Sequence, residues 1–100
     1  MKRRTSCDIT PKTRQRVYER DGACIICGSH SMLQTAHYIG RAQGGLGIEE
    51  NLVILCAKCH ADFDNGHKHK EYGEFIRAYL MNRYPGWNEE DLIYNKWRYI

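Results

Sequence analysis

Two short cysteine motifs decide the fold: Cys24-Ile-Ile-Cys27 and Cys56-Ala-Lys-Cys59, with His37 between them. Zinc binds four cysteine thiolates in a closed tetrahedron, and two close Cys-x-x-Cys pairs supply that ligand set. Structural zinc contributes an apparent ~10–16 kcal/mol to the folding of finger peptides, which is comparable with the whole stability of a small domain. We therefore predict that all four cysteines bind one structural zinc ion and that His37 stays outside this site.

The composition describes one small domain. A chain of 100 residues can bury only a modest core, so a metal site matters to its stability. No stretch approaches the ~20 apolar residues of a membrane span, and no secretion signal follows the first charges. We therefore expect a cytoplasmic protein without a membrane partner, in which paired cysteines bind metal rather than form disulfides. Cys7 fits neither motif and is expected to be unpaired and unimportant.

The net charge of +3 is unevenly spread, because Lys and Arg are concentrated in the first twenty residues. A basic end indicates either a polyanionic partner or a solvated, solubilising surface, and charge alone leaves both open. We expect residues 1–8 to form a flexible basic lead.

Turn residues and apolar spacing predict an α+β arrangement. Thr10 and Pro11 are typical of a helix N-cap and first turn, with Val17 facing inward and the charges of this helix outward. The aromatic residues near the C-terminal end fall at helical spacing, which favours core packing over a base-stacking platform. The predicted helices span residues 11–20, 57–64, 72–84 and 89–97, and the predicted strands span residues 33–39 and 52–55.

Five short elements occur in an order that resembles the HNH endonucleases, also called ββα-metal or His-Me finger nucleases. The resemblance is closest to small phage-type members with a four-cysteine zinc site, and it covers about residues 10–66. It implies one small zinc-stabilised ββα-metal domain over residues 1–100, with residues 67–100 as a helical C-terminal extension. The elements that carry it are Cys24-Ile-Ile-Cys27-Gly28, Ala36-His37-Tyr38, Gly44-Gly45, Asn51-Leu-Val-Ile-Leu55 and Cys56-Ala-Lys-Cys59-His60.

The resemblance implies three catalytic roles. His37 would be the general base that takes a proton from the attacking water, which suits an imidazole because its pKa lies near neutral pH. A backbone carbonyl would hold the proton on its other ring nitrogen. Asn51 would hydrogen-bond backbone groups across the hairpin loop and so orient His37. His60 would bind a catalytic divalent ion, Mg²⁺, Mn²⁺ or another.

The sequence departs from the family at one position. Many members carry a metal-binding side chain immediately before the base, whereas this chain has Ala36. Asp64 follows His60 by four residues and shares a helical face with it, as a ligand of the colicin-type DNases does, so Asp64 is the best candidate for the second ligand. His67 and His69 are weaker candidates.

Two functions of different classes remain open. The first is a metal-dependent DNA endonuclease that nicks or cuts double-stranded DNA in a phage packaging, recombination or restriction setting. Its partners would be DNA and phage packaging proteins in the cytoplasm of the bacterial host, with Arg41 contacting a DNA phosphate. The second is a non-catalytic zinc-dependent DNA-binding or assembly module, which the missing ligand at Ala36 motivates.

Overall fold

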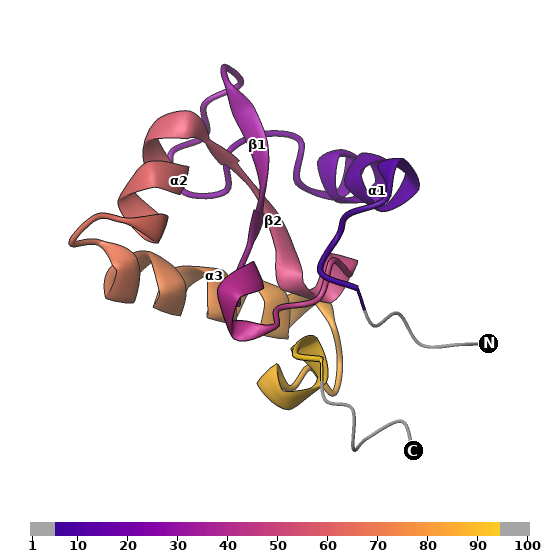
Figure 1. The fold of residues 1–100 in the computed structure, drawn as a ribbon. Helices are drawn as coiled ribbons and strands as arrows, with labels where there is room; N and C mark the ends of the chain where they lie inside the picture. The colour runs from indigo at the N-terminus through magenta and orange to yellow at the C-terminus, as the bar shows by residue number, and fades with distance from the viewer. Residues whose placement is uncertain (1–5, 95–100) are drawn as a thin grey trace, which may run out of the picture.

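The computed structural model describes residues 6–94. A two-stranded antiparallel hairpin lies at its centre, and Figure 1 shows α1 on one side of it and α2 and α3 on the other. The α+β class and the zinc-compatible core predicted from the sequence are therefore confirmed. The elements are α1 (Pro11–Asp21), β1 (Leu33–His37), η1 (Arg41–Gln43), η2 (Glu49–Asn51), β2 (Leu52–Cys56), α2 (Ala57–Asp64), α3 (His69–Arg83) and η3 (Glu89–Leu92).

Both faces of β2 are covered, which explains why its sequence is apolar throughout. Successive side chains of a strand point to opposite faces. Val53 and Leu55 pack into the core cluster that contains residues of α2 and α3, and Leu52 and Ile54 pack against Val17 of α1. The packing thus fixes β2 from both sides. The strand in turn positions the hairpin loop that precedes it and the start of α2 that follows it.

Two of the predicted helix starts are present in the structure. Thr10 caps α1 by accepting a hydrogen bond from the Thr13 backbone at 3.1 Å, and Pro11 is its first residue. The helix at residues 57–64 has the predicted bounds. The first strand is shorter than predicted and ends at His37, because the backbone N–H of Ile39 donates to the Asn51 side chain at 2.8 Å instead of continuing the ladder.

The prediction of a last helix over residues 89–97 is wrong for its described part. A short 3-10 helix ends at Leu92, after which Ile93 takes an extended conformation and pairs with Gly45 of the hairpin loop. The backbone N–H of Leu46 donates to the Leu92 carbonyl at 2.7 Å. The hairpin loop therefore forms hydrogen bonds with backbone groups that a longer helix would need for its own hydrogen bonds. Residues 95–97 of the predicted helix lie outside the described residues.

The helix predicted over residues 72–84 is α3, which begins at His69. The predicted core packing of its aromatic residues holds only in part, because Phe75 is 48% exposed, whereas Ile76 and Leu80 are buried.

Residues 6–8, at the end of the lead predicted for residues 1–8, contact the hairpin loop. The Gly47 backbone donates to the Ser6 carbonyl at 2.9 Å. Asp8 also forms an ion pair with Arg41 at 2.8 Å, so this segment is bound to the hairpin loop.

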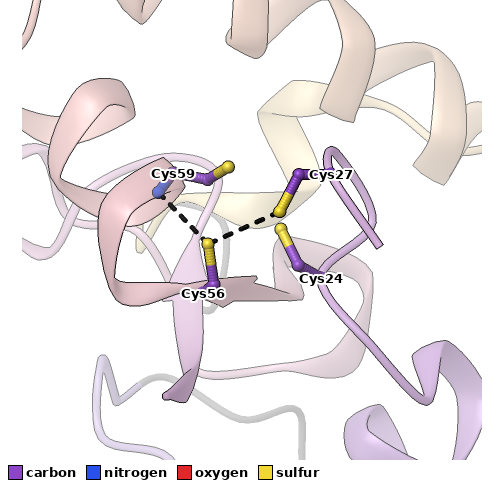
Figure 2. A group of neighbouring side chains, drawn as sticks. All are labelled: Cys24, Cys27, Cys56 and Cys59. Carbon is purple, nitrogen blue, oxygen red and sulfur yellow. Dashed lines mark hydrogen bonds between the residues drawn. The ribbon is translucent and has the colours of Figure 1, made fainter. Parts of the chain in front are cut away.

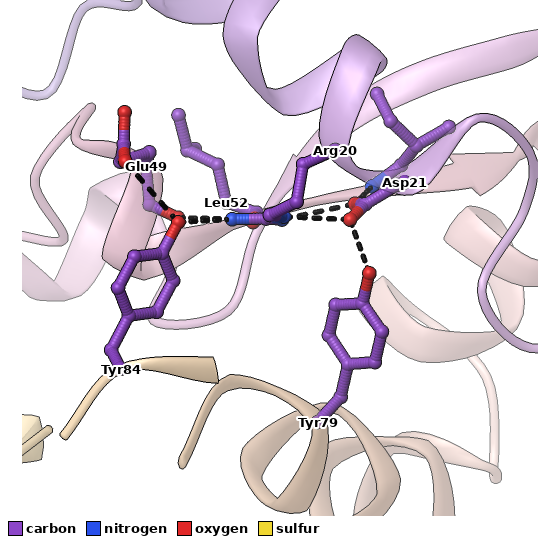
Figure 3. Close-up of polar contacts among 7 residues, drawn as sticks. Arg20, Asp21, Glu49, Leu52, Tyr79 and Tyr84 are labelled. Carbon is purple, nitrogen blue, oxygen red and sulfur yellow. Dashed lines mark hydrogen bonds and ion pairs between the residues drawn. The ribbon is translucent and has the colours of Figure 1, made fainter. Parts of the chain in front are cut away.

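An ion pair at the end of α1 connects three elements, although the sequence predicted outward charges there. Arg20 and Asp21 join each other through two hydrogen bonds, at 2.7 and 2.9 Å, and the Asp21 side chain is fully buried (Figure 3). Arg20 also donates to the Leu52 carbonyl at 2.6 Å. Asp21 accepts from the Ile54 backbone at 2.9 Å and from the Tyr79 hydroxyl. The pair therefore fastens α1 to β2 and α3.

The substitution Asp21→Ala is expected to destabilise the zinc-bound protein by about 3–5 kcal/mol, because it leaves the Arg20 guanidinium buried without its counter-charge. Urea unfolding in the presence of zinc measures this loss. The matched control is Asp62→Ala, which removes the half-buried i,i+4 partner of the exposed Lys58 at 3.8 Å and should cost about 0.5 kcal/mol or less. Equal effects of the two substitutions would contradict a structural role for the buried pair.

Candidate metal sites and catalytic cleft

The four cysteines of the two motifs converge on one point. Their sulfur atoms all lie within 4.8 Å of one another, and those of Cys27 and Cys56 are 3.6 Å apart (Figure 2). A tetrahedral zinc ion with Zn–S bonds of about 2.3 Å would hold its sulfur ligands about 3.8 Å apart. Within residues 6–94 this is the one cluster of three or more metal-binding side chains. The donor set and its spacing therefore fit the predicted zinc site.

The two motifs reach this point by different local structures. Residues 24–28 form a tight knuckle in which the Gly28 backbone donates to the Cys24 carbonyl at 2.9 Å, and Gly28 takes a φ of 80° that favours glycine. Cys56 ends β2 and caps α2 by accepting from the Cys59 backbone at 3.5 Å. The zinc ligands thus clamp the knuckle to the junction of β2 and α2.

The thiols of the cluster differ in pKa. Burial opposes ionisation of Cys24, but backbone N–H groups, among them that of Cys27, lower its pKa to about 7. Burial and the neighbouring sulfurs raise the pKa of Cys59. Four adjacent thiolates repel one another, so a cation at their centre is needed for all four to ionise together.

A separate cleft of about 550 Å³ lies between the hairpin and α2. His37 at the end of β1 and His60 and Asp64 of α2 all line it, together with Arg41 of η1. The structure therefore brings four of the side chains predicted for the site to one cavity. Asn51 is not among the lining residues, because it is fully buried within the loop.

His37 has the backbone partner that the sequence predicted, but it comes from a distant segment. Its Nε2 lies 2.9 Å from the carbonyl oxygen of Cys7. Burial lowers the pKa of His37 below its ordinary value, the Cys7 carbonyl partly opposes this, and the positive charge of Arg41 lowers the pKa further. The ring is therefore neutral at pH 7, which is the state in which an imidazole accepts a proton.

Asn51 holds the loop between the strands from within. Its side-chain oxygen accepts from the Ile39 backbone at 2.8 Å, and its amide donates to the carbonyls of Ile39 and Leu46 at 3.1 and 2.9 Å. These are the hydrogen bonds that were expected across the hairpin loop. Because Ile39 lies two residues after His37, the bonds fix the backbone that follows His37.

His60 and Asp64 form a pair on one face of α2. The Nε2 of His60 lies 2.9 Å from a carboxylate oxygen of Asp64, and its Nδ1 lies 2.6 Å from the side-chain oxygen of Gln34. Because an amide oxygen only accepts, the second bond places a proton on Nδ1. The lone pair of Nε2 and the Asp64 carboxylate could then bind one divalent ion, since neighbouring ligands with bonds of about 2.1 Å lie about 3 Å apart.

The remaining sequence candidates lie at different places. Ala36 is 1% exposed and belongs to the core cluster around Val53, so a polar ligand at this position would have been buried. His69 lines the cleft, but its ring stacks on Phe63 and its Nδ1 donates to the Phe63 carbonyl at 2.8 Å. His67 is exposed and does not line the cleft.

Sequence reasoning missed Gln34 and the Cys7 carbonyl. Gln34 is an ordinary exposed position of a strand, and no local pattern connects it with His60, which lies 26 residues further on. A backbone carbonyl carries no signal in the sequence at all. Each contact depends on the pairing of distant segments.

Fold and sites together define a class of protein. It is a small α+β protein in which four cysteines fix a β-hairpin to the helix that follows, and histidines from the strand and the helix share one cleft. The model of the HNH endonuclease family matches residues 24–71. Residues 24–71 therefore match the HNH endonuclease family, and together with the four-cysteine cluster this confirms the resemblance that the sequence predicted. No curated protein matches the chain.

The family match has a coarse functional meaning. It implies a nuclease that binds metal and acts on DNA. In residues 6–94, moreover, no helix is long and apolar enough to cross a membrane.

Proposed function

We propose that this protein is a metal-dependent DNA endonuclease that hydrolyses phosphodiester bonds and nicks or cuts double-stranded DNA. One observation carries the proposal: His37 from β1 and the His60–Asp64 pair from α2 line the same cleft. A base and an ion-binding pair that line one cleft can act on one phosphate bound there. The family match supports nuclease chemistry, and the structure supplies the residues.

His37 acts as the general base. Its neutral ring takes a proton from a water molecule while the water oxygen forms a bond to phosphorus. The bond between phosphorus and the 3′ oxygen breaks, and solvent returns a proton to the departing oxygen. Asn51 keeps the loop closed, so that the backbone carrying His37 does not shift between catalytic cycles.

His60 and Asp64 would hold the catalytic divalent ion, since a nitrogen and a carboxylate oxygen 2.9 Å apart fit two neighbouring ligand positions. When bound, such an ion neutralises charge on the scissile phosphate and on the departing oxygen. Gln34 supports this arrangement by holding the proton of His60 on the nitrogen that faces away from Asp64.

The test is plasmid cleavage with Mg²⁺ or Mn²⁺ combined with metal analysis. The wild type should hold one tight zinc ion and one weaker, exchangeable ion. His60→Ala should keep the zinc and lose the exchangeable ion. Its cleavage rate should fall by on the order of 10²-fold or more, since the ion supplies several kcal/mol of transition-state stabilisation. The matched control is His30→Ala, an exposed histidine that does not line the cleft.

The competing function has a distinct outcome in the same experiment. A protein that holds zinc alone, and that fails to cleave DNA whichever divalent ion is added, would be a non-catalytic zinc-dependent DNA-binding or assembly module. Cleavage that persists unchanged in His60→Ala would instead place the catalytic ion elsewhere.

Arg41 is proposed to contact a DNA phosphate at the rim of the cleft. Its side chain is 60% exposed and pairs with the Asp8 carboxylate at 2.8 Å, an anion that a phosphate can replace. Arg41→Ala should weaken DNA binding about equally for all sequences and reduce the slope of log K against log salt by about 1. Binding titrations at several salt concentrations measure this, and an unchanged slope would exclude the contact.

A role in phage DNA packaging or recombination is the biological setting that we propose, with restriction as the competing role. The support is the resemblance to small phage-type HNH proteins. Genes for packaging proteins beside the gene for this chain would agree with the first setting, and a neighbouring DNA methyltransferase gene would favour the second.

A further inference from the structure

A second cavity continues the catalytic cleft along α3. It has a volume of about 430 Å³ and lies between the hairpin loop and α3, and Figure 1 shows this loop in front of α3. The residues that line both this cavity and the cleft are Tyr38, Gly40, Gln43, Phe63 and His69. A DNA strand with one phosphate in the cleft can therefore pass directly into the second cavity, which we call the α3 groove.

The α3 groove is open because position 73 is a glycine. Gly73 lines the groove from within α3, where glycine is destabilising relative to alanine. Its φ is outside the left-handed region, and an added Cβ would meet only Phe63, at an ordinary 3.5 Å. Neither the backbone conformation nor crowding therefore requires a glycine here. Its effect is to leave space beside Phe63 that a larger side chain would fill.

The lining of the groove suits a flat aromatic group. Phe63 is buried, and the His69 ring stacks on it with 15° between the ring planes and 4.9 Å between the centroids. His69 is nevertheless exposed, so the face of its ring that points away from Phe63 is open for stacking. The hairpin adds Tyr38 and Ile39 to the lining. Nucleobases stack on such aromatic platforms largely independently of their sequence.

The charged residues of the groove favour a phosphate at one place and a base at another. Lys70 is exposed and forms no ion pair with another residue of the described range 6–94, so its ammonium group is available to a phosphate. Arg77 is already paired with Glu89 at 3.0 Å. Glu74 lies one helical turn after Lys70. Its carboxylate repels a phosphate, but it can accept a hydrogen bond from the amino group of a base.

We propose that the α3 groove binds one unpaired nucleobase of the DNA strand that is cleaved, with a neighbouring phosphate at Lys70. The inference rests on the proposed nuclease function and narrows its substrate to double-stranded DNA with an unpaired nucleotide beside the scissile bond. A paired base is stacked inside the duplex and enters the groove only if its nucleotide turns out of the helix. Gly73 and Glu74 lie beyond the residues that the family model matches, so the groove depends on the C-terminal part of this chain.

The first test measures the binding of three DNA duplexes without cleavage. Zinc-bound wild type, with no Mg²⁺ or Mn²⁺ added, is titrated with a fully paired duplex, the same duplex with one bulged nucleotide, and that duplex with an abasic residue in the bulge. The bulged duplex should bind about 10-fold more tightly than the paired one, as expected for the stacking of one base. The abasic duplex should lose this gain. Equal affinity of the bulged duplex and either of the other two would overturn the proposal.

The second test fills the groove with Gly73→Leu. The new side chain occupies the space beside Phe63, so the affinity for the bulged duplex should fall about 10-fold, to that of the abasic duplex. The matched control is Ala78→Leu, which adds the same side chain at an exposed position of α3 outside the groove lining and should keep the preference. A preference that survives in folded Gly73→Leu would place the base elsewhere. If Gly73→Leu loses its fold, the comparison of bulged and abasic duplexes on the wild type decides.

The outcomes separate this inference from the proposed function. If the wild type prefers the bulged duplex to the abasic one but cleaves no DNA with any divalent ion, the nuclease function fails and the base-binding groove stands. If the wild type cleaves DNA but binds the bulged and abasic duplexes equally, the groove assignment is wrong even though the protein is a nuclease.

Discussion

Loss of the four-cysteine site is expected to unfold the protein and not merely to inactivate it. In Cys24→Ser, or after removal of zinc by a strong chelator, the knuckle is no longer attached to the junction of β2 and α2. The free energy of zinc binding is about 10–16 kcal/mol on the scale of zinc-finger peptides, which is comparable with the whole stability of a small domain. The remaining core is small, because a two-stranded hairpin needs helix packing to be stable.

Circular dichroism during chelator titration measures this effect, together with zinc content by elemental analysis. The wild type should lose its helical signal as zinc is removed and regain it when zinc is restored. The matched control is Cys7→Ser, which changes a cysteine outside the cluster and should keep both zinc and fold. A zinc-free protein with an unchanged spectrum would show that hydrophobic packing alone supports the hairpin.

The second large effect is expected from His37→Ala. Removal of a general base lowers kcat by about 10²- to 10⁴-fold. Zinc content, the exchangeable ion and the melting temperature should stay close to those of the wild type, because His37 belongs to neither metal-binding group. Plasmid nicking in Mg²⁺ or Mn²⁺ provides the rate, with His30→Ala as the control. Equal nicking by wild type and His37→Ala would exclude this residue as the base.

The same assignment predicts the pH dependence. The base works as a neutral ring, and burial lowers the pKa of His37 below 6.5. Activity at saturating metal should therefore rise as the pH increases through that lowered pKa and be constant near neutrality. His37→Ala should lack this rise, whereas His30→Ala should keep it. A wild-type rate that still increases steeply above pH 7.5 would contradict a buried, neutral base (a flat region is required from about one unit above the pKa).

The sequence predicted most of what depends on short spacing. Two Cys-x-x-Cys motifs indicated the zinc cluster, Thr10 and Pro11 indicated the start of α1, and the apolar run of β2 indicated a buried strand. An i,i+4 relation placed Asp64 beside His60 on one helical face. Each of these features lies within one element or turn, where covalent geometry fixes the distances.

The sequence failed where distant segments compete for the same groups. Arg20 and Asp21 looked like surface charges of a helix end, but Leu52, Ile54 and Tyr79 supply enough partners to bury them. The helix predicted after Asn88 stops early because the hairpin loop offers hydrogen bonds to its backbone, as Leu46 does for Leu92.

By itself the sequence determined the class of this protein and its four-cysteine cluster, because ligand spacing and helical periodicity act within a few residues. Only the tertiary structure decided how His37 and His60 are held. The partner of His37 is the Cys7 carbonyl, the partner of His60 is Gln34, and the segment at Cys7 depends on the small volume of Gly47. These contacts join residues that lie far apart in the chain, so they exist only after the hairpin has paired and packed.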